Sequence, residues 1–314
     1  MDIVVVMDPV TKVKWYGDTS FALMLSAQER GHRVFHCSMG DVSLVENHVW
    51  ATARLATMTD EVSPPIKLGD PIELDLEAVD AIFIRTDPPF EGRYLTMTLV
   101  LEHLRGHTLV VNDPRGLREA NEKLYACRFP DLMPPTVVTA NREHLLAFAR
   151  RHEGAVLKPI NGHGGRGVVT LQPGDRNERA IVDQMTDRGR RLVMAQKFLE
   201  EVYHGDERIL LLDGEPLGVL LRTPTPGDFR ANIGVGGTVT LVEMTDAHRS
   251  IAAAMAPKLR SDGLWFVGID VIGGCLSEVN VTSPTGMRHL GRLTGTRPDH
   301  TVIEWVENRV ANSI

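Results

Sequence analysis

The first strand-like segment of the chain limits its fold more than any other feature. Residues 2–7, DIVVVM, are a continuous run of apolar and mostly β-branched side chains that ends at Asp8 and Pro9. Because polar residues do not alternate with the apolar ones, this run predicts a strand that is buried on both faces. Strands of that kind belong to parallel sheets, which helices cover on both sides.

Strand and helix patterns alternate in the residues that follow. The first helix is expected to begin near Asp18 or Thr19 and to end at Gly31. Further strands are expected at 32–37, 81–85 and 108–112, and a second helix at 92–105. This alternation predicts an α/β domain with a largely parallel sheet. Residues 46–79 are harder to place and are expected to carry an edge strand or a long loop.

In the second part of the chain the strand patterns are shorter and the turns more frequent. A helix is expected over 114–131, and a break follows at Leu132–Pro135. Beyond the break we expect strands at 136–139, 155–160, 168–175 and 192–201, a helix at 142–152 and a hairpin over 205–216.

The overall composition excludes several classes of protein. The 314 residues carry a net charge of −7, which argues against binding of nucleic acid through bulk electrostatics. No apolar run approaches the length that crosses a bilayer, and the N-terminus lacks the pattern of a secretory signal. Cys37, Cys127 and Cys275 form neither a CxxC pair nor an even framework, which fits a reducing compartment. We therefore expect a cytoplasmic protein with no nucleic-acid or membrane partner.

A segment near the C-terminus, DVIGGCLSEVNVTSPTG at 270–286, gathers oxygen ligands. Glu278 and Asn280 are two residues apart, so on a strand they lie on the same face. Carboxylate and carboxamide oxygens suit Mg²⁺, which shares the rest of its shell with phosphates and water. Asp270 joins them if the two strands pair in the right register. The alternative is a solvated hairpin with ordinary surface acids.

The register of this hairpin depends on its turn. A two-residue turn at 273–274 would pair Ile272 with Cys275 and put Asp270 and Glu278 on opposite faces. A three-residue turn that includes Cys275 would instead set the two carboxylates directly opposite each other on one face. We predict the three-residue turn, because only that register builds a site.

Residues 162–167, GHGGRG, match the GxGxxG pattern of dinucleotide-binding loops. That fingerprint needs a helix directly after the loop, so that a pyrophosphate meets the helix N-terminus. Here Val168, Val169 and Thr170 follow, which are poor helix formers. We therefore predict a Gly-rich loop between two strands, whose backbone N–H groups can cover phosphates.

Other residues along the chain suit a nucleotide site, although each alone fits an ordinary surface or core position. Lys158 stands just before the Gly-rich loop, and Lys123 is a second candidate for binding phosphates. The strand at 192–201 can link two subdomains and offer the backbone of 196–199 to an adenine edge. Asp206 and Arg208 begin the following hairpin on one face.

Residues 220–237, LLRTPTPGDFRANIGVGG, are rich in Pro and Gly. The segment is too broken for regular structure and too long for a simple connector. Long loops of this kind often close over active sites. We predict a mobile lid at 223–238, with Arg222 and Arg230 as its phosphate-facing charges.

These features follow one another in the order of a known architecture. From Met7 to about residue 290 the chain resembles the bacterial glutathione synthetases of the ATP-grasp superfamily. The resembling segments are MDP, DTSFALMLSAQERGH, IRTDPPF, LREANEKL, LKPINGHGG, MAQ, LLDGEP, FVGIDVIGG and EVNVTSPTG.

The resemblance implies an ATP-grasp fold of mixed α/β and α+β class. Residues 1–122 would form an N-terminal Rossmann-like domain, called pre-ATP-grasp. Residues 123–200 would form a central lid domain with the Gly-rich loop. Residues 201–314 would form the C-terminal ATP-grasp domain with the mobile loop 223–238. ATP would be gripped between two antiparallel sheets.

The resemblance also implies an activity. ATP would phosphorylate the cysteinyl carboxylate of γ-glutamylcysteine, and the amine of glycine would attack the acyl phosphate. The implied cofactors are ATP and Mg²⁺, with Mn²⁺ as a substitute. The implied partners are small molecules, namely the dipeptide donor, the amino-acid acceptor and ATP. We expect a homo-oligomer, either a dimer or a tetramer.

Individual roles follow from the matching motifs. The nucleotide would be bound by Lys123, Lys158, Gly164, Gly165, Gly167, Gln196, Lys197, Phe198, Leu199 and Asp206. The metal would be bound by Asp270, Glu278 and Asn280. Catalytic stabilisation would come from Arg208, Arg222 and Arg230. The substrates would be contacted by Asp18, Arg85, Ser283, Pro284, Thr285 and Gly286.

The chain departs from the family pattern near the expected dipeptide site. The family usually has a positive charge where this chain has Gly17, Thr86 and Thr238. One alternative is therefore a related ATP-grasp ligase with a different acyl donor or amine acceptor. Another is a non-catalytic ATP-binding regulatory subunit, which the complete set of metal ligands disfavours.

Overall fold

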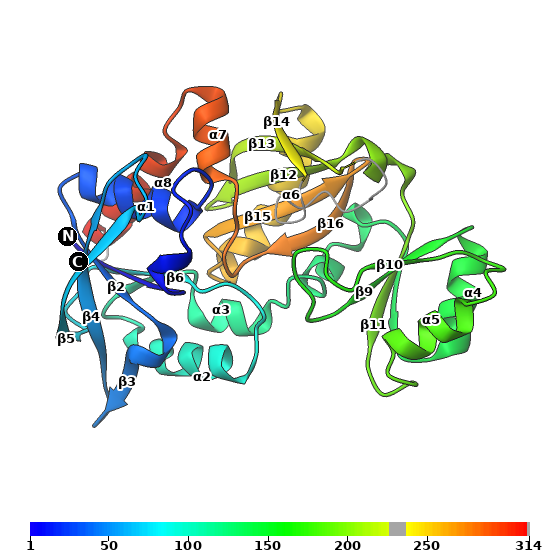
Figure 1. Ribbon diagram of the computed structural model, residues 1–314, viewed down its shortest axis with the longest axis horizontal. Coiled ribbons are helices and arrows are strands. Elements are labelled where there is room, and N and C mark those ends of the chain that lie inside the picture. The colour runs from blue at the N-terminus through cyan, green and yellow to red at the C-terminus, as the bar shows by residue number, and fades with distance from the viewer. Residues whose placement is uncertain (226–236, 313–314) are drawn as a thin grey trace.

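The structure is a computed structural model that describes residues 1–225 and 237–312. Its strands form a seven-stranded, a four-stranded and a five-stranded sheet. Figure 1 shows the five-stranded sheet between the other two along the long axis, although it follows both in the sequence. The chain therefore visits the far end before it returns to the middle.

The seven-stranded sheet contains the N-terminal strands. They are β1 (Asp2–Met7), β2 (Arg33–Cys37), β3 (Val42–Val45), β4 (His48–Met58), β5 (Ile66–Asp75), β6 (Ala81–Arg85) and β7 (Leu109–Val111). Strands β2, β1, β6 and β7 are parallel neighbours, which confirms the predicted sheet. Residues 46–79, not assigned from the sequence, contain the long antiparallel pair β4 and β5.

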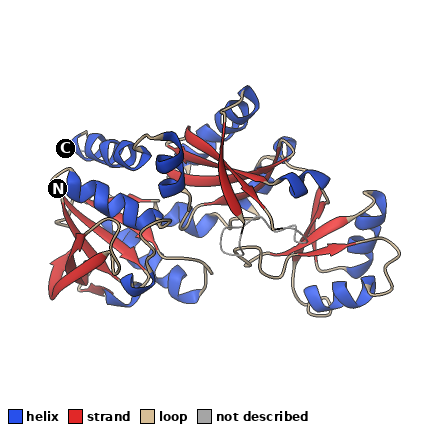
Figure 2. Ribbon diagram, turned by 45° about the horizontal axis from the view of Figure 1, so that its top comes forward, coloured by secondary structure: helices blue, strands red, loops and turns tan. Residues whose placement is uncertain are grey.

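Three helices accompany this sheet: α1 (Thr19–Glu29), α2 (Gly92–Leu101) and α3 (Pro114–Glu119). Asp18 caps α1 as expected, because its Oδ1 accepts a hydrogen bond from the N–H of Phe21 at 2.8 Å. The C-terminal helices α7 (Met287–Thr294) and α8 (Pro298–Ala311) pack against α1. Figure 2 shows α8 lying beside α1, so the end of the chain completes the N-terminal unit.

The helix expected over 114–131 is wrong beyond Glu119. The chain leaves the helix at Ala120, and only short 3₁₀ turns follow, at Tyr125–Arg128 and Pro130–Leu132. Asn121 supplies the physical reason, since its Oδ1 accepts from the N–H groups two and three residues later, both at 3.1 Å. Asparagine side chains that bond locally in this way compete with the helix.

The four-stranded sheet is antiparallel in the order β10-β9-β11-β8. Its strands are β8 (Thr136–Thr139), β9 (Ala155–Pro159), β10 (Val169–Leu171) and β11 (Val193–Lys197). The helices α4 (Arg142–Arg151) and α5 (Glu178–Met185) share one apolar core with it. The Gly-rich loop joins β9 to its antiparallel neighbour β10, as the sequence predicted.

The five-stranded sheet has the order β14-β13-β12-β15-β16. Its strands are β12 (Asp206–Leu212), β13 (Glu215–Thr223), β14 (Thr238–Val242), β15 (Phe266–Ile272) and β16 (Cys275–Asn280), with helix α6 (Asp246–Ser261). The prediction that 220–237 lacks regular structure is wrong at its start, because 220–223 continue β13. Pairing on both sides carries the strand that far, since Arg222 pairs with Asp206 of β12 and Thr223 with Thr238 of β14. Most of the expected lid 223–238, namely 226–236, lies outside the described residues.

Smaller elements complete the description. Further 3₁₀ turns are Val10–Lys12, Met39–Asp41, Glu102–Leu104 and Glu200–His204. Within the described ranges, every helix is too short or too polar to cross a membrane.

The contact between α8 and α1 gives a stability prediction. Ile303 on α8 is fully buried in the core that α8 shares with β1 and α1. Replacing Ile303 with Ala should lower the free energy of unfolding by about 2–5 kcal/mol, because the cavity can close only in part. Urea denaturation followed by tryptophan fluorescence measures this change.

The neighbouring Glu304→Ala variant is the control. Its carboxylate is more than half exposed, and its pair with Arg30 contributes at most about 1 kcal/mol. Equal losses in the two variants would show that α8 is not part of the N-terminal core.

Candidate active site

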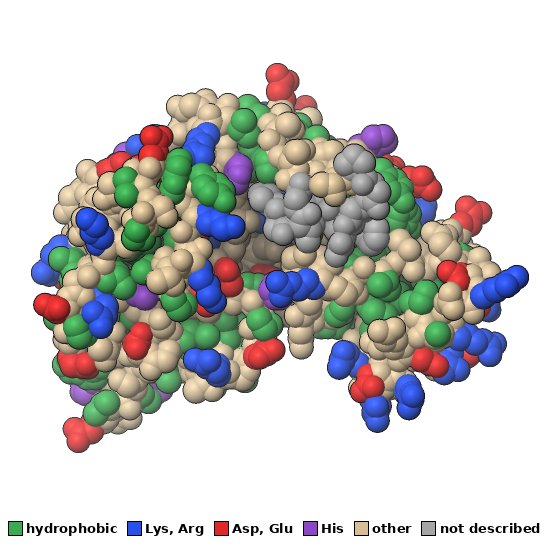
Figure 3. Space-filling view, viewed as in Figure 1, with side chains coloured by type: hydrophobic (Ala, Val, Ile, Leu, Met, Phe, Trp, Pro, Cys, Tyr) green, Lys and Arg blue, Asp and Glu red, His purple; other side chains and the backbone are tan. Residues whose placement is uncertain are grey.

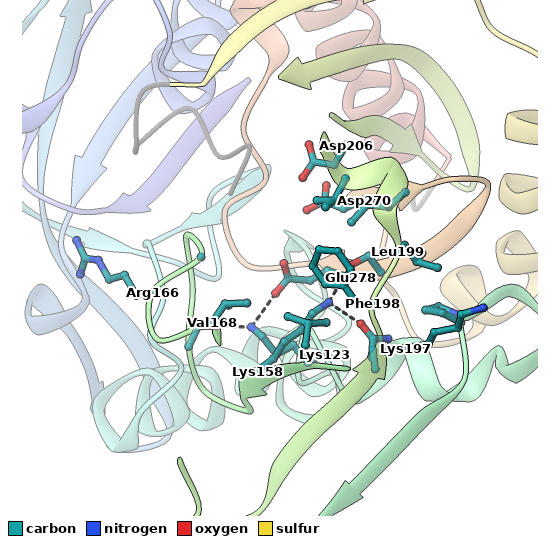
Figure 4. A pocket seen from close by; sticks show the side chains of 18 residues that line it. Lys123, Lys158, Arg166, Val168, Lys197, Phe198, Leu199, Asp206, Asp270 and Glu278 are labelled. Atoms are coloured by element: carbon teal, nitrogen blue, oxygen red, sulfur yellow. Dashed lines mark hydrogen bonds and ion pairs between the residues drawn. The ribbon is translucent and has the colours of Figure 1, made fainter. Parts of the chain in front are cut away.

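A pocket lies between the four-stranded and the five-stranded sheet, and Figure 4 shows the side chains that line it. Strands β9 and β11 and the Gly-rich loop border one side, and β12, β15 and β16 border the other. The predicted site residues that line it are Lys123, Lys158, Gly165, Gln196, Lys197, Phe198, Leu199, Asp206, Asp270 and Glu278. Residues far apart in the sequence therefore meet here as expected.

The Gly-rich loop borders this pocket with its backbone. Gly164, Gly165 and Gly167 have φ angles of +60°, +72° and +72°, a region that glycine enters without steric cost. Gly165 lines the pocket, whereas Gly164 and Gly167 shape the loop around it. The glycines of the motif are thus required by the turn that brings the loop over the pocket.

Two lysines place their ammonium groups in the pocket from different elements. Nζ of Lys123 donates to the carbonyl of Gly162 and to Oε1 of Glu278, the latter at 2.8 Å. Nζ of Lys158 donates to Oε1 of Gln196 at 2.5 Å and to Oγ of Ser277 at 2.9 Å. Withdrawal of this ammonium from water lowers the pKa of Lys158 to about 8.

The hairpin of β15 and β16 corrects the predicted turn but keeps the predicted pairing. The turn has two residues, because Ile272 pairs with Cys275. Asp270 nevertheless pairs with Glu278, since the register shifts by one residue between these two pairs. Ser277 is the extra residue of this β-bulge. This bulge was not predicted from the sequence. It restores the register and directs Ser277 to Lys158.

Behind the pocket, two arginines hold two aspartates. Nε and Nη2 of Arg208 donate to the oxygens of Asp270 at 2.5 and 3.1 Å. Arg222 binds both oxygens of Asp206 at 2.6 and 2.7 Å, and its Nη2 lies 2.9 Å from Oδ2 of Asp270. Burial alone would raise the pKa of Asp270, but Arg208 and Arg222 hold it below the ordinary range. Asp270 is therefore a charged carboxylate in the resting site.

The expected metal ligands form a hard-oxygen donor set. Within residues 1–225 and 237–312, no group of three His, Cys, Asp or Glu side chains is placed to hold an ion by itself. The predicted set instead uses a carboxamide: Nδ2 of Asn280 lies 3.3 Å from Oδ2 of Asp270, and Glu278 lies opposite Asp270 on the paired strand. The two carboxylates and the carboxamide on these paired strands are ligands that suit Mg²⁺.

A second cavity of about 430 Å³ opens at the carboxyl ends of β1 and β6. The chain runs from β1 to β2 on one side and from β6 to β7 on the other, so these ends form the switch point of the parallel sheet. Open α/β sheets bind ligands at such points. The space-filling view in Figure 3 shows a hollow near the middle of the molecule, with charged side chains of both signs around it.

Arg85 is the buried cation of this second cavity. Its side chain is almost fully buried, its Nε donates to Oγ of Ser20 at 3.1 Å and its Nη2 donates to the carbonyl of Pro284 at 2.9 Å. Its Nη1 has no hydrogen-bond partner among the described residues. A buried donor without a partner is costly, so Nη1 of Arg85 is an unsatisfied polar atom beside this cavity.

The loop of residues 282–286 lies between the two sites. Ser283 and Thr285 line the second cavity together with Asp18 and Arg85. The carbonyl of Thr285 accepts from Nη1 of Arg208 at 3.2 Å, on the side of the first pocket. The residues predicted to contact substrates are thereby brought together, with Gly286 at the start of α7.

Some predicted residues lie elsewhere or remain undescribed. Arg208 and Arg222 do not line the first pocket; they support it from behind. Arg230 lies outside the described residues. Of the three departures from the family pattern, Thr86 alone lines the second cavity in the described part of the chain. Gly17 adjoins His289, since a Cβ at Gly17 would lie 3.2 Å from its ring.

Sequence reasoning missed several residues of the site. Ser277 gave no signal because a lone serine in a strand is ordinary. Ser20 follows the cap of α1 and reads only as a helix residue, although it orients Arg85. Glu122 stands beside the predicted Lys123 and accepts three hydrogen bonds from Val281 and Thr282. The sequence signal for Glu122 was its position next to Lys123, which was predicted to bind the nucleotide.

Two family models match this chain. The family model for the N-terminal domain of prokaryotic glutathione synthetase matches residues 1–118, and the model for its ATP-grasp domain matches residues 122–295. A glutathione synthetase of Synechocystis sp. is 43% identical over 98% of this chain and 100% of its own length. One of Rhodopseudomonas palustris is 41% identical over 97% of both chains.

Solved structures share the fold at much lower identity. The D-cycloserine synthetase DcsG is 17% identical, with a TM-score of 0.65 over 98% of this chain and 100% of that one. The ATP-grasp ligase PsnB, in complex with a phosphomimetic precursor variant, Mg and ADP, is 17% identical with a TM-score of 0.64 over 98% of both chains. The expected ATP-grasp fold of mixed α and β structure is confirmed.

The lowered pKa of Lys158 gives a prediction for nucleotide binding. As the pH rises through about 8, the ammonium loses its proton and with it the attraction for phosphates. The dissociation constant of ATP should therefore rise by up to about tenfold per pH unit above that point. Calorimetric titration of ATP between pH 7 and about 9.5 measures the profile.

The Lys158→Arg variant is the comparison, since a guanidinium stays charged over this range. Its profile should be flat, whatever its absolute affinity. Parallel profiles in the two proteins would assign the pH dependence to another group.

Proposed function

Because the chain belongs to the prokaryotic glutathione synthetase family, we propose that its two cavities form one active site, with ATP in the first and γ-glutamylcysteine in the second. The protein is an ATP-dependent ligase that forms a C–N bond, of the glutathione synthetase type.

The loop 282–286 carries the proposal, because it lines the second cavity and bonds to Arg208, which supports the first pocket from behind. Within the loop 282–286, the carbonyl of Pro284 binds Arg85 and the next carbonyl binds Arg208. Arg85 faces the second cavity, whereas Arg208 holds Asp270 at the first. A carboxylate in the second cavity would therefore lie close to a phosphate in the first, as phosphoryl transfer between them requires.

The nucleotide roles follow the lining of the first pocket. Lys123 and Lys158 would bind the phosphates, and the Gly-rich loop would cover them. The segment Gln196–Leu199 would contact adenine, and Asp206 the ribose. In the resting site both oxygens of Asp206 are held by Arg222, so ribose would share this carboxylate with the guanidinium.

Mg²⁺ would be held by Asp270, Glu278 and the amide oxygen of Asn280, and Mn²⁺ suits the same ligands. When bound there, the ion would neutralise charge on the phosphate oxygens. In the structure, Arg208 pairs with Asp270 and Lys123 pairs with Glu278. These cations hold the acids in place and are themselves released toward the phosphates when the ligands assemble.

The chemistry needs positioning and charge stabilisation and no protein nucleophile. The cysteinyl carboxylate of the donor attacks the γ-phosphorus, ADP leaves, and an acyl phosphate forms. The amine of glycine then attacks the acyl carbon and phosphate leaves. Lys123 and Lys158 would stabilise the charge that moves to ADP, while Arg208 and Arg222 would stabilise the acyl phosphate. Arg85 would hold the donor.

The proposal extends to the setting of the enzyme. The three cysteines are free thiols, which fits a reducing cytoplasm.

We also propose a homo-oligomer, either a dimer or a tetramer. Leu95 and Leu99 on α2 and Val45 at the end of β3 expose apolar surface that a second copy could cover. Light scattering after size-exclusion chromatography measures the oligomeric state.

A panel assay tests the function. Purified protein is incubated with ATP, Mg²⁺ and combinations of dipeptides and amines, and phosphate release and ligation product are measured together. Glutathione from γ-glutamylcysteine and glycine is the expected product. Preference for another pair would favour the alternative ligase, and nucleotide binding without any turnover would favour a regulatory subunit.

Glu278 gives a prediction for the metal site. The Glu278→Gln variant removes one negative charge from the proposed ligand set, so turnover at saturating ATP and Mg²⁺ should fall by about 10²–10⁴-fold. Folding should change little, because the side chain borders an open pocket and the carboxamide oxygen can still accept from Lys123. Steady-state kinetics with increasing Mg²⁺ measures the loss, and wild-type turnover would remove Glu278 from the site.

Arg85 gives a prediction for the donor. The Arg85→Lys variant keeps the charge but loses the planar fork, so the KM for γ-glutamylcysteine should rise by about 10–100-fold while the KM for ATP stays unchanged. The control is Arg33→Lys, an exposed arginine that pairs with Asp2 outside both cavities. An equal rise of both Michaelis constants would place Arg85 in a general structural role.

A further inference from the structure

Glu122 joins three parts of the active site without belonging to any of them. Its Oε1 accepts hydrogen bonds from the N–H of Val281 at 3.1 Å, the N–H of Thr282 at 3.2 Å and Oγ1 of Thr282 at 2.8 Å. Its own carbonyl accepts from the N–H of Val279 at 2.9 Å. Burial raises the pKa of this carboxyl, and Glu278 raises it further.

We propose that Glu122 is a positioning residue that fixes the start of the loop 282–286 relative to Lys123, and thereby keeps ATP consumption coupled to ligation. The inference rests on the proposed function, since it needs an acyl phosphate that either an amine or water can attack. Glu122 itself touches neither the nucleotide pocket nor the second cavity in the described residues.

The neighbours of Glu122 explain why its position matters. Lys123 holds Glu278 and the carbonyl of Gly162, so it connects the strand β16 to the Gly-rich loop. On the other side, Asn121 donates to the carbonyl of Ile160 at 3.3 Å, at the end of β9. The tripeptide 121–123 thus touches the four-stranded sheet, the five-stranded sheet and the loop between the cavities.

The loop has three anchors along its length. Glu122 holds its first residue, Thr282, while Arg85 and Arg208 hold the carbonyls of Pro284 and Thr285. Arg85 lines the second cavity and Arg208 holds Asp270 at the first pocket, so both are expected to adjust when ligands bind. Glu122 lines neither the nucleotide pocket nor the second cavity and so provides the fixed end of the loop.

Loss of this anchor has a chemical consequence. If the loop is displaced, water reaches the acyl phosphate before the amine does. The bond between the acyl carbon and the phosphate oxygen then breaks by hydrolysis, phosphate leaves, and the donor carboxylate is regenerated. ATP is consumed without formation of a C–N bond, which exclusion of water normally prevents.

The test compares Glu122→Ala with Glu122→Gln. Alanine removes all three side-chain acceptor contacts, whereas the glutamine carboxamide still offers an oxygen to the same donors. In Glu122→Ala, kcat/KM for glycine should fall by about 10²-fold, since small displacements of a site can cost that much. The ratio of phosphate released to glutathione formed should rise above the wild-type ratio, and Glu122→Gln should restore most of both.

Glu119→Ala is the matched control, an exposed glutamate of α3 that pairs with Arg115 at 2.9 Å. It should leave the coupling ratio and the kinetics unchanged. A normal coupling ratio and a normal KM for glycine in a folded Glu122→Ala protein would overturn the proposal. So would an equal loss in Glu122→Ala and Glu122→Gln, because the acceptor oxygen would then be irrelevant.

A milder pair of variants covers the case in which Glu122→Ala does not fold. Thr282→Val removes only the hydroxyl that bonds to Glu122, and Thr282→Ser retains it. Uncoupling in the valine but not in the serine variant supports the proposal, and normal coupling in both opposes it. If the wild type makes no glutathione, the proposed function fails separately, and the same ratio is measured with the substrate pair found in the panel.

Discussion

The carboxylate of Asp270 is the group on which the geometry of the active site depends. It is buried and yet charged, because Arg208 and Arg222 stand on either side of it. Such a buried cluster adds little net stability, since the cost of desolvation offsets most of the attraction. Its effect is geometric. It fixes the relative positions of β12, β13 and β15, and it presents an anionic oxygen at the edge of the nucleotide pocket.

The arrangement of the three sheets explains why one loop can serve two cavities. The five-stranded sheet lies in the middle, with the four-stranded sheet on one side and the parallel sheet on the other (Figure 1). After β16 the chain leaves this middle sheet toward the carboxyl ends of β1 and β6, and α7 and α8 then pack against α1. Residues 282–286 are the segment that passes from the middle sheet to the parallel sheet. Their position is therefore set by the packing of α8 as well as by Arg85, Arg208 and Glu122.

The sequence predicted what depends on local pattern and missed what depends on packing. Strand β1 and helix α1 followed from an apolar run and a cap residue, and both lie where expected. The bulge at Ser277 has no local signature, so the turn was predicted wrongly although the pairing of Asp270 with Glu278 was right. Likewise the helix after Pro114 ends early because the side chain of Asn121 bonds to the backbone of Lys123 and Leu124, a competition that helix periodicity does not reveal.

The charges of the second cavity bear on the departures from the family pattern. The missing lysine at Thr86 does not leave the cavity without cations. Lys12, Arg85 and Arg93 line it, together with the acids Asp8, Asp18, Asp87 and Glu91. A cavity of mixed sign selects by the placement of its charges and not by net potential. The glutamyl end of the proposed donor is itself a zwitterion, with an ammonium and a carboxylate that such a surface can pair. The loss of one lysine therefore removes affinity for anions in general and leaves the basis for recognising this dipeptide in place.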